Sequence, residues 1–215
     1  MNIAETIDSR LRQAPVVPLI QADDPAVAIQ TARALVAGGL TVIEVVLRTP
    51  AAIKCLKAIA EEVPEAIVGA GTVLSEDQVE AVLLAGTQFV VLPGLYSPVI
   101  QVAQSADLPV FPGVATATEA QHGWNMGLRT LKFFPASLAG GIPMLKALGS
   151  VFGGMSFMPT GGVSAANLGE FLAVPSVLAC GGSWLTPKAA IAESKYEVIT
   201  GLAAEAVAIA QKVRG

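Results

Sequence analysis

Residues 41–49 read TVIEVVLRT, and this stretch decides the fold class. Its β-branched residues favour a strand. Alternation with a period of two places Glu44 and Arg48 on one face and only aliphatic side chains on the other. Strands this apolar are typical of parallel sheets, which helices cover and bury on both faces. We therefore expect the aliphatic face to pack on helices and the two charges to point into the interior.

Similar runs recur along the chain and alternate with Ala-rich helical stretches, which is the pattern of βα units. The expected strands begin near Pro15, Thr41, Ala66, Phe89, Pro109, Thr130, Ser156 and Val177. The expected helices cover residues 24–37, 50–62, 75–85, 97–105, 118–126, 142–148 and 164–172, with flanking helices over about 2–13 and 196–213. Eight such units predict an α/β fold, a compact (β/α)₈ TIM barrel with an extra N-terminal helix. No linker interrupts the series, so residues 1–215 are expected to form a single domain.

An open, doubly wound sheet is the alternative for the same pattern. The dinucleotide-binding turn of such a sheet has three glycines in the order GxGxxG. The best match, Gly69-Ala70-Gly71, has Leu74 where the last glycine belongs. The barrel is therefore favoured, and 215 residues is near its lower limit of about 200, so its loops must be short.

The composition excludes several classes of protein. The 13 basic and 17 acidic residues give a net charge of −4 without charged runs, so no nucleic-acid partner is expected. The mean hydropathy of +0.63 is high, but no stretch approaches the roughly 20 apolar residues of a membrane span. The first dozen residues carry charges instead of a signal-peptide pattern. We expect a cytoplasmic protein with no membrane partner.

Metal chemistry is also not expected. The chain has one histidine, His122, and two cysteines, Cys55 and Cys180, which are 125 positions apart in apolar surroundings. No His/Cys cluster with zinc or iron spacing can be assembled from them. Both cysteines are expected to be reduced and to pack as small hydrophobic residues, and His122 to lie at the surface.

Lys132 is the third charge within an expected strand, beside Glu44 and Arg48. Barrel active sites lie at the carboxyl ends of the strands, where these three would converge. A lysine among aromatic residues and away from water has its ammonium form disfavoured, which leaves an amine that attacks ketones. Glu44 is then a proton shuttle, and Arg48 offers a bidentate fork for a carboxylate. An internal salt-bridge network is the structural alternative for the same three residues.

Paired glycines follow the last two expected strands. Residues 159–164 read PTGGVS and residues 181–184 read GGSW. Glycine lets backbone N–H groups approach an anion, and a helix that starts near Ser164 would point its positive end at the same place. Phosphate sites in barrels lie at this pair of loops. The two glycine pairs, followed by Ser164 and Ser183, therefore favour a phosphate-binding site over simple turns.

Six motifs resemble, in order and spacing, those of the 2-dehydro-3-deoxy-phosphogluconate (KDPG/KHG) aldolase family. They are EVVLRT at 44–49, VGAGTVL at 68–74, PGL at 93–95, KFFPA at 132–136, PTGG at 159–162 and GGSW at 181–184. The resemblance implies a compact barrel, a homotrimer, and a Schiff-base lysine that needs no metal or cofactor. It also implies cleavage of 2-dehydro-3-deoxy-6-phospho-D-gluconate to pyruvate and D-glyceraldehyde 3-phosphate in the Entner–Doudoroff pathway. Many members of the family also split 4-hydroxy-2-oxoglutarate to pyruvate and glyoxylate.

The resemblance also implies a role for each matching residue. Lys132 is the Schiff-base residue and Glu44 the proton acceptor and donor. The matching residues for substrate binding are Arg48 and Thr72 for the pyruvyl carboxylate, Pro93 and Phe134 for the pocket around the imine, and Gly161, Gly162 and Ser183 for the phosphate. Thr160 matches the position that carries Thr in the gluconate branch of the family and Val in the galactonate branch, so it favours the gluconate substrate.

Two other functions remain open on the residues alone. An isomerase or epimerase on a phosphate-binding barrel would explain the glycine loops but not an inward lysine. A non-catalytic sugar-phosphate binding protein would keep Arg48 and the glycine loops and tolerate the loss of Glu44 and Lys132. Turnover without Lys132 would indicate the isomerase or epimerase, and failure to release pyruvate would indicate the binding protein.

Overall fold

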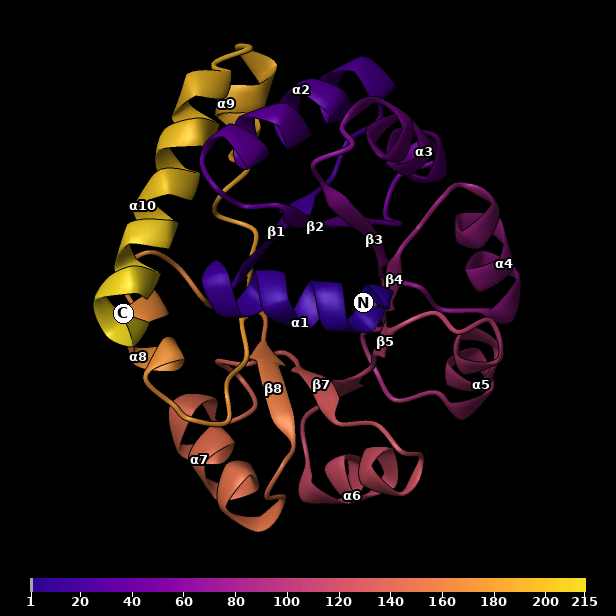
Figure 1. Ribbon diagram of the computed structural model, residues 1–215, viewed down its shortest axis with the longest axis vertical. Coiled ribbons are helices and arrows are strands. Elements are labelled where there is room, and N and C mark those ends of the chain that lie inside the picture. Colours follow the sequence, from indigo (N-terminus) through magenta and orange to yellow (C-terminus); the bar gives the residue numbers. More distant parts are fainter. Residues whose placement is uncertain (1) are drawn as a thin grey trace.

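The computed structural model describes residues 2–215, in which short parallel strands alternate with helices (Figure 1). The strands are β1 (Val16–Ile20), β2 (Val42–Val46), β3 (Ile67–Gly71), β4 (Phe89–Val91), β5 (Val110–Phe111), β6 (Gly113–Val114), β7 (Thr130–Phe133), β8 (Ser156–Pro159) and β9 (Cys180–Gly182). The helices are α1 (Ile3–Gln13), α2 (Pro25–Ala37), α3 (Ala52–Glu62), α4 (Glu76–Leu84), α5 (Ser97–Ser105), α6 (Ala117–Asn125), α7 (Gly141–Val151), α8 (Leu168–Leu172), α9 (Lys188–Ala192) and α10 (Tyr196–Arg214). The α/β class is therefore confirmed, and α1 is the expected N-terminal helix.

The prediction of a closed eight-stranded TIM barrel is wrong, because the strands form two separate sheets. A six-stranded parallel sheet has the order β5-β4-β3-β2-β1-β9, and a three-stranded parallel sheet has the order β6-β7-β8. The expected fifth strand divides at Pro112, which has no N–H to donate: β5 before it pairs with β4, and β6 after it pairs with β7. On the other side, the strands described within residues 2–215 are joined by two isolated bridges, Phe157 to Val177 and Thr160 to Gly181.

Side-chain caps mark the starts of α1, α2, α4 and α6. Asp24 accepts a hydrogen bond from the backbone of Ala26 ahead of α2, whose first residue is proline. The expected helix at 164–172 is shorter than predicted, since α8 begins only at Leu168. The Asn167 side chain accepts from the Ser164 N–H at 2.8 Å and donates to the Gly162 carbonyl at 2.9 Å, which holds residues 162–167 in a non-helical turn.

Helix α1 lies across the middle of the molecule, in front of the strands in Figure 1. Its buried residues Ile7 and Leu11 pack in one hydrophobic cluster with Val17 and Val42, which lie at the amino ends of β1 and β2. The helix thus covers the amino ends of the strands, and the opposite, carboxyl ends carry the loops that follow them. No helix within residues 2–215 is long and apolar enough to cross a membrane.

Both cysteines are buried and unpaired, as expected. Burial raises the pKa of the Cys180 thiol to about 12, against a smaller opposing effect of the nearby Arg214 guanidinium. Burial also raises the pKa of the Cys55 thiol. The two side chains therefore pack as small hydrophobic residues and are not activated thiols.

Candidate active site

Glu44 and Lys132 meet in the interior of the molecule. Glu44 is the third residue of β2 and Lys132 the third residue of β7, and each is only 3% exposed. Lys132 Nζ lies 3.8 Å from Glu44 Oε1, which makes an ion pair but not a hydrogen bond. Glu44 Oε1 is buried without any hydrogen-bond partner. A buried carboxylate oxygen without a hydrogen-bond partner lowers the stability of the fold. Such groups are typical of functional sites.

The carboxyl group of Glu44 occupies the space beside Gly71, the last residue of β3, where any side chain would overlap it. A Cβ at Gly71 would overlap the Glu44 carboxyl group, and β3 pairs with β2 in the register Val46 to Gly71. Sequence reasoning singled out this glycine only as part of a motif. Its signal was a glycine inside a strand pattern, which often marks a close approach of another group.

Arg48 lies beyond the end of β2 and is exposed, not inside with the pair. The alternation that was expected to carry it into the interior ends with the strand at Val46. Arg48 instead donates from Nε to Oγ1 of Thr72 at 3.2 Å. Thr72 follows β3 directly and has a left-handed φ of 59°. The two predicted carboxylate ligands are therefore brought together at the carboxyl ends of β2 and β3.

Phe134 and Pro93 flank the lysine. The Phe134 ring centroid lies 5.1 Å from Lys132 Nζ, a distance at which the ring face attracts a cation. Pro93 comes two residues after β4, and its carbonyl would overlap a Cβ placed on Gly113. Gly113 is the register partner of Lys132, so Pro93 lies beside the lysine-bearing strand. Both residues thus border the position of the amine.

The two glycine loops leave neighbouring strand ends. Thr160 and Gly181 form an isolated parallel bridge, and Gly162 and Ser183 each lie two residues beyond a member of it. Gly161 and Gly162 have φ angles of 96° and 86°, which only glycine adopts readily. The helix expected to begin near Ser164 begins at Leu168 instead, and the Asn167 side chain accepts the Ser164 N–H.

Two further residues complete the geometry. Thr160 is buried and lines the interior cavity together with Glu44 and Lys132. Ser137, which the sequence analysis did not single out, packs over Gly162, where its hydroxyl would overlap a Cβ. Glu44 and Lys132 are the two charged residues that line the interior cavity. Among residues 2–215, no three His, Cys, Asp or Glu side chains are grouped so as to hold a metal ion.

Comparisons with known proteins agree with this arrangement. The family model of KDPG and KHG aldolases matches residues 7–202. The chain is 47% identical over 206 residues to the KHG/KDPG aldolase of Escherichia coli strain K12, covering 96% of this chain and 97% of that protein.

Two solved structures are also similar. The 2-keto-3-deoxy-6-phosphogluconate aldolase of Zymomonas mobilis ZM4 with 3-phosphoglycerate matches with a TM-score of 0.87 and 44% identity, covering 94% of this chain and 95% of that one. The KDPG aldolase of Legionella pneumophila, with pyruvate captured as a covalent carbinolamine intermediate, matches with a TM-score of 0.88 and 41% identity, covering 92% and 96%.

A buried lysine and carboxylate on an α/β scaffold of this kind define a Schiff-base aldolase, a lyase that forms a covalent bond with its ketone substrate. The chain belongs to the KDPG and KHG aldolase family.

Proposed function

We propose that this chain cleaves 2-dehydro-3-deoxy-6-phospho-D-gluconate to pyruvate and D-glyceraldehyde 3-phosphate, with Lys132 as the Schiff-base residue. The observation that carries the proposal is the buried pair of Lys132 Nζ and the unsatisfied Glu44 Oε1, 3.8 Å apart. The named relatives support the substrate. Residues 1–215 act as one aldolase unit in this proposal.

The first half of the reaction forms the imine. The neutral amine of Lys132 attacks the C2 ketone carbon, and the carbonyl oxygen takes a proton, which gives a carbinolamine. Glu44 donates a proton to the departing hydroxyl, which leaves as water, and the nitrogen lone pair forms the C=N bond of a protonated imine.

The second half breaks the carbon–carbon bond. The Glu44 carboxylate takes the proton of the C4 hydroxyl through a water molecule, C4 becomes the aldehyde of glyceraldehyde 3-phosphate, and the electrons of the C3–C4 bond move to the imine nitrogen. The resulting enamine takes a proton at C3. Water then hydrolyses the imine, which releases pyruvate and restores the Lys132 amine.

The remaining residues bind the two ends of the substrate. Arg48 and Thr72 hold the pyruvyl carboxylate through charge-assisted hydrogen bonds. Pro93 and Phe134 shape the pocket around the imine. Gly161, Gly162 and Ser183 bind the phosphate through the adjacent loops. Thr160 contacts the sugar chain of the substrate beside Glu44 and Lys132. It favours the configuration of the gluconate substrate over that of the galactonate. The same centre splits 4-hydroxy-2-oxoglutarate to pyruvate and glyoxylate, since that substrate shares the pyruvyl end.

The test is covalent trapping. Borohydride reduction in the presence of pyruvate is expected to add a stable mass to the peptide that contains Lys132, and a coupled lactate dehydrogenase assay should detect pyruvate release from both substrates. Lys132→Met should abolish both signals. Lys146→Met is the matched control, since Lys146 is exposed. Labelling at another lysine, or turnover in folded Lys132→Met, would overturn the mechanism.

The chain acts as a homotrimer in the cytoplasm in this proposal. The family resemblance supports both points. Leu74 and Tyr96, which are 58% and 57% exposed, line one surface hollow beside Pro93, and a subunit contact would cover such apolar side chains. Sedimentation equilibrium should give three times the 21.9 kDa mass of the chain. A monomer at micromolar concentration would contradict the trimer.

A further inference from the structure

The loop after β8 is held in its conformation by the side chain of Asn167. Nδ2 of Asn167 donates to the Gly162 carbonyl at 2.9 Å, and Oδ1 of the same amide accepts the Ser164 N–H at 2.8 Å. The two hydrogen bonds fix the chain on both sides of Val163, which is buried. One partly buried side chain, four residues before the end of the short helix α8 at its nearest turn, therefore sets the path of residues 162–164.

The orientation of the Gly162 carbonyl determines which backbone groups of the loop are free. The peptide that follows Gly162 is trans, and a trans peptide directs its C=O and its N–H to opposite sides. The carbonyl that faces Asn167 therefore turns the Val163 N–H away from that side chain. Within residues 2–215, neither Gly162 nor Val163 donates its N–H to another backbone group. Free backbone N–H groups in succession bind anions, whereas a carbonyl oxygen directed at the same place repels them.

The two carbonyls before Gly162 are also engaged, by the chain that follows β7. The Ala136 N–H donates to the Thr160 carbonyl at 2.8 Å, and the Ser137 N–H donates to the Gly161 carbonyl at 3.0 Å. Backbone groups make both of these bonds, so they do not depend on a particular side chain. The Gly162 carbonyl is the one of the three that is held by a side chain, and a substitution at Asn167 releases it.

We infer that Asn167 is a positioning residue for the phosphate end of the substrate. Its amide holds the Gly162 carbonyl away from the phosphate, which leaves the N–H groups of Gly162 and Val163 to bind the phosphate oxygens. The inference rests on the proposed function, in which Gly162 binds the phosphate. Asn167 acts through the backbone of the loop, to which both polar atoms of its side chain are bound.

The two proposed substrates separate this role from a purely structural one. 2-Dehydro-3-deoxy-6-phospho-D-gluconate carries a phosphate and 4-hydroxy-2-oxoglutarate does not, although both share the pyruvyl end that binds near Lys132. A misplaced Gly162 carbonyl weakens binding of the phosphorylated substrate alone. A general loss of structure at this side of the molecule would instead affect both substrates, because Thr160 in the preceding strand end lines the same cavity as Lys132.

The experiment compares the steady-state kinetics of both substrates in Asn167→Ala and Asn167→Asp. Loss of the amide is expected to raise KM for the phosphorylated substrate about tenfold and to leave KM for 4-hydroxy-2-oxoglutarate within about twofold of the parent. The inhibition constant of inorganic phosphate against the phosphorylated substrate should rise by a similar factor. Asn167→Asp keeps the oxygen that accepts from Ser164 but loses the donor to Gly162, so it should raise KM at least as much as Asn167→Ala.

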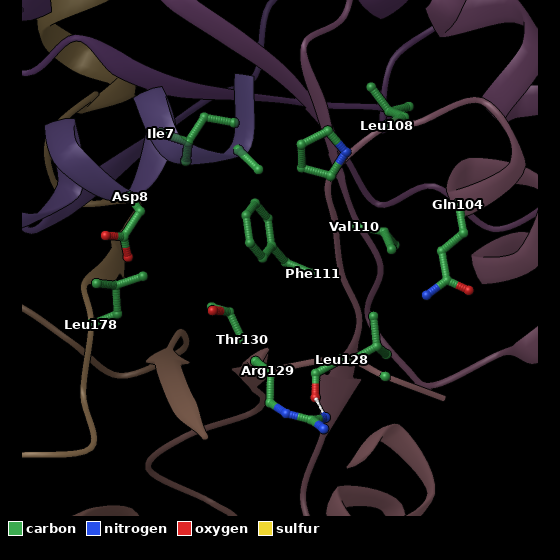
Figure 2. Close-up of a pocket in the computed structure, with 13 residues that line it drawn as sticks. Ile7, Asp8, Gln104, Leu108, Val110, Phe111, Leu128, Arg129, Thr130 and Leu178 are labelled. Carbon is green, nitrogen blue, oxygen red and sulfur yellow. Dashed lines mark hydrogen bonds between the residues drawn. The ribbon is translucent and has the colours of Figure 1, made fainter. Parts of the chain in front are cut away.

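Arg129 provides a control for the measurements with inorganic phosphate, because its guanidinium is another group that attracts an anion. It lines an open groove of about 290 Å³, where its Nη1 donates to the Leu128 carbonyl at 2.7 Å (Figure 2). Arg129 directly precedes β7, at the amino end of that strand, whereas Gly162 follows the carboxyl end of β8. Arg129→Gln should therefore leave the inhibition constant and both KM values unchanged. Phosphate inhibition that depends on Arg129 and not on Asn167 would contradict the inference.

Asn125→Ala is the matched control for loss of an amide. Asn125 is exposed on α6, and its oxygen accepts from the Gln121 side chain at 3.2 Å, so both KM values should stay at the parent level. Equal increases in KM for the two substrates in Asn167→Ala, or an unchanged KM for the phosphorylated one, overturn the inference. If Asn167→Ala does not fold, Asn167→Asp decides by the same two outcomes. A parent protein that releases no pyruvate from either substrate would instead refute the proposed function.

Discussion

Arg48 and Thr72 are joined by a hydrogen bond of 3.2 Å from the guanidinium Nε to the hydroxyl Oγ1. Thr72 holds a φ of 59°, which a β-branched residue rarely adopts and which costs of order 1–3 kcal/mol. The strained backbone keeps the hydroxyl against the guanidinium. Because Nε is engaged by Thr72, the two terminal nitrogens of Arg48 are the donors left for a substrate carboxylate.

We therefore expect Arg48→Lys to raise KM about tenfold for both proposed substrates, with a smaller change in kcat. Lysine keeps the charge but loses the planar fork that binds a carboxylate through two hydrogen bonds. An interaction made equally in the ground and transition states affects KM and not kcat. Steady-state kinetics with coupled pyruvate detection measures both constants. Arg33→Lys, at an exposed ion pair, should leave them unchanged; an unaltered KM in Arg48→Lys would argue against this role.

Gly71→Ala should reduce kcat at least tenfold without unfolding the protein. The new methyl group would overlap the Glu44 carboxyl group, so the carboxylate must turn away from its place beside Lys132, and small displacements of catalytic groups have large effects on rate. Gly201→Ala is the control, since a Cβ there meets nothing within 4 Å. That change lies inside α10 and should raise the free energy of unfolding by about 0.5–1 kcal/mol. Normal turnover in Gly71→Ala would show that the Glu44 position is not critical.

The buried pair of Glu44 and Lys132 is expected to lower the free energy of unfolding relative to apolar residues in the same space. Glu44→Met or Lys132→Met alone leaves one charge in the interior without its partner, so each should lower the free energy of unfolding by about 3 kcal/mol. The double variant fills the same space with apolar side chains and should be at least as stable as the parent. Urea unfolding of all four proteins tests the cycle, and the three variants should release no pyruvate. A double variant less stable than both single variants would refute the expectation.

Glu119 should make the stability of α6 depend on pH. Burial raises the pKa of Glu119, but hydrogen bonds from Ala115 and Thr116 outweigh it and hold the pKa below its usual value. The carboxylate therefore stabilises the fold above the unfolded-state pKa of about 4.3, and this contribution is lost as the pH falls through the folded-state value.

Glu119→Gln should thus lower the free energy of unfolding by about 1 kcal/mol at pH 7. The difference from the parent should vanish in acid, where Glu119 is protonated in the parent as well. Urea unfolding at a series of pH values measures this. The exposed Glu80 provides the control Glu80→Gln, which should match the parent throughout. A constant difference at all pH values would mean that the charge of Glu119 is not the cause.

Much of the site could be predicted because scarce charges in apolar strands are informative. Alternation in 41–49 correctly places Glu44 in the interior, where it is 3% exposed, and the same reasoning holds for Lys132. It fails for Arg48, because a period of two applies only while the strand continues and β2 ends at Val46. The sequence shows the pattern of a strand more clearly than its last residue.

The errors in the fold arise from strand pairing and side-chain hydrogen bonds that the strand and helix patterns do not show. Residues 109–114 look like one strand, but Pro112 divides them between two sheets, and the pairing partners of each half are not visible locally. The helix expected from Ser164 is delayed to Leu168 because the Asn167 side chain binds backbone groups at Gly162 and Ser164.

The residues that bury α1 come from nearly the whole length of the chain. Ile7 and Leu11 share a cluster with Val17 and Val42 but also with Met158 and Leu178. The helix is synthesised before all of these partners and can be buried only after they have followed it. Contacts of such long sequence separation form late in folding. Ile7, Leu11 and Met158 also line the interior cavity that holds Glu44 and Lys132. A chain that ends between Lys132 and Met158 would therefore contain both charged residues without the complete cavity around them.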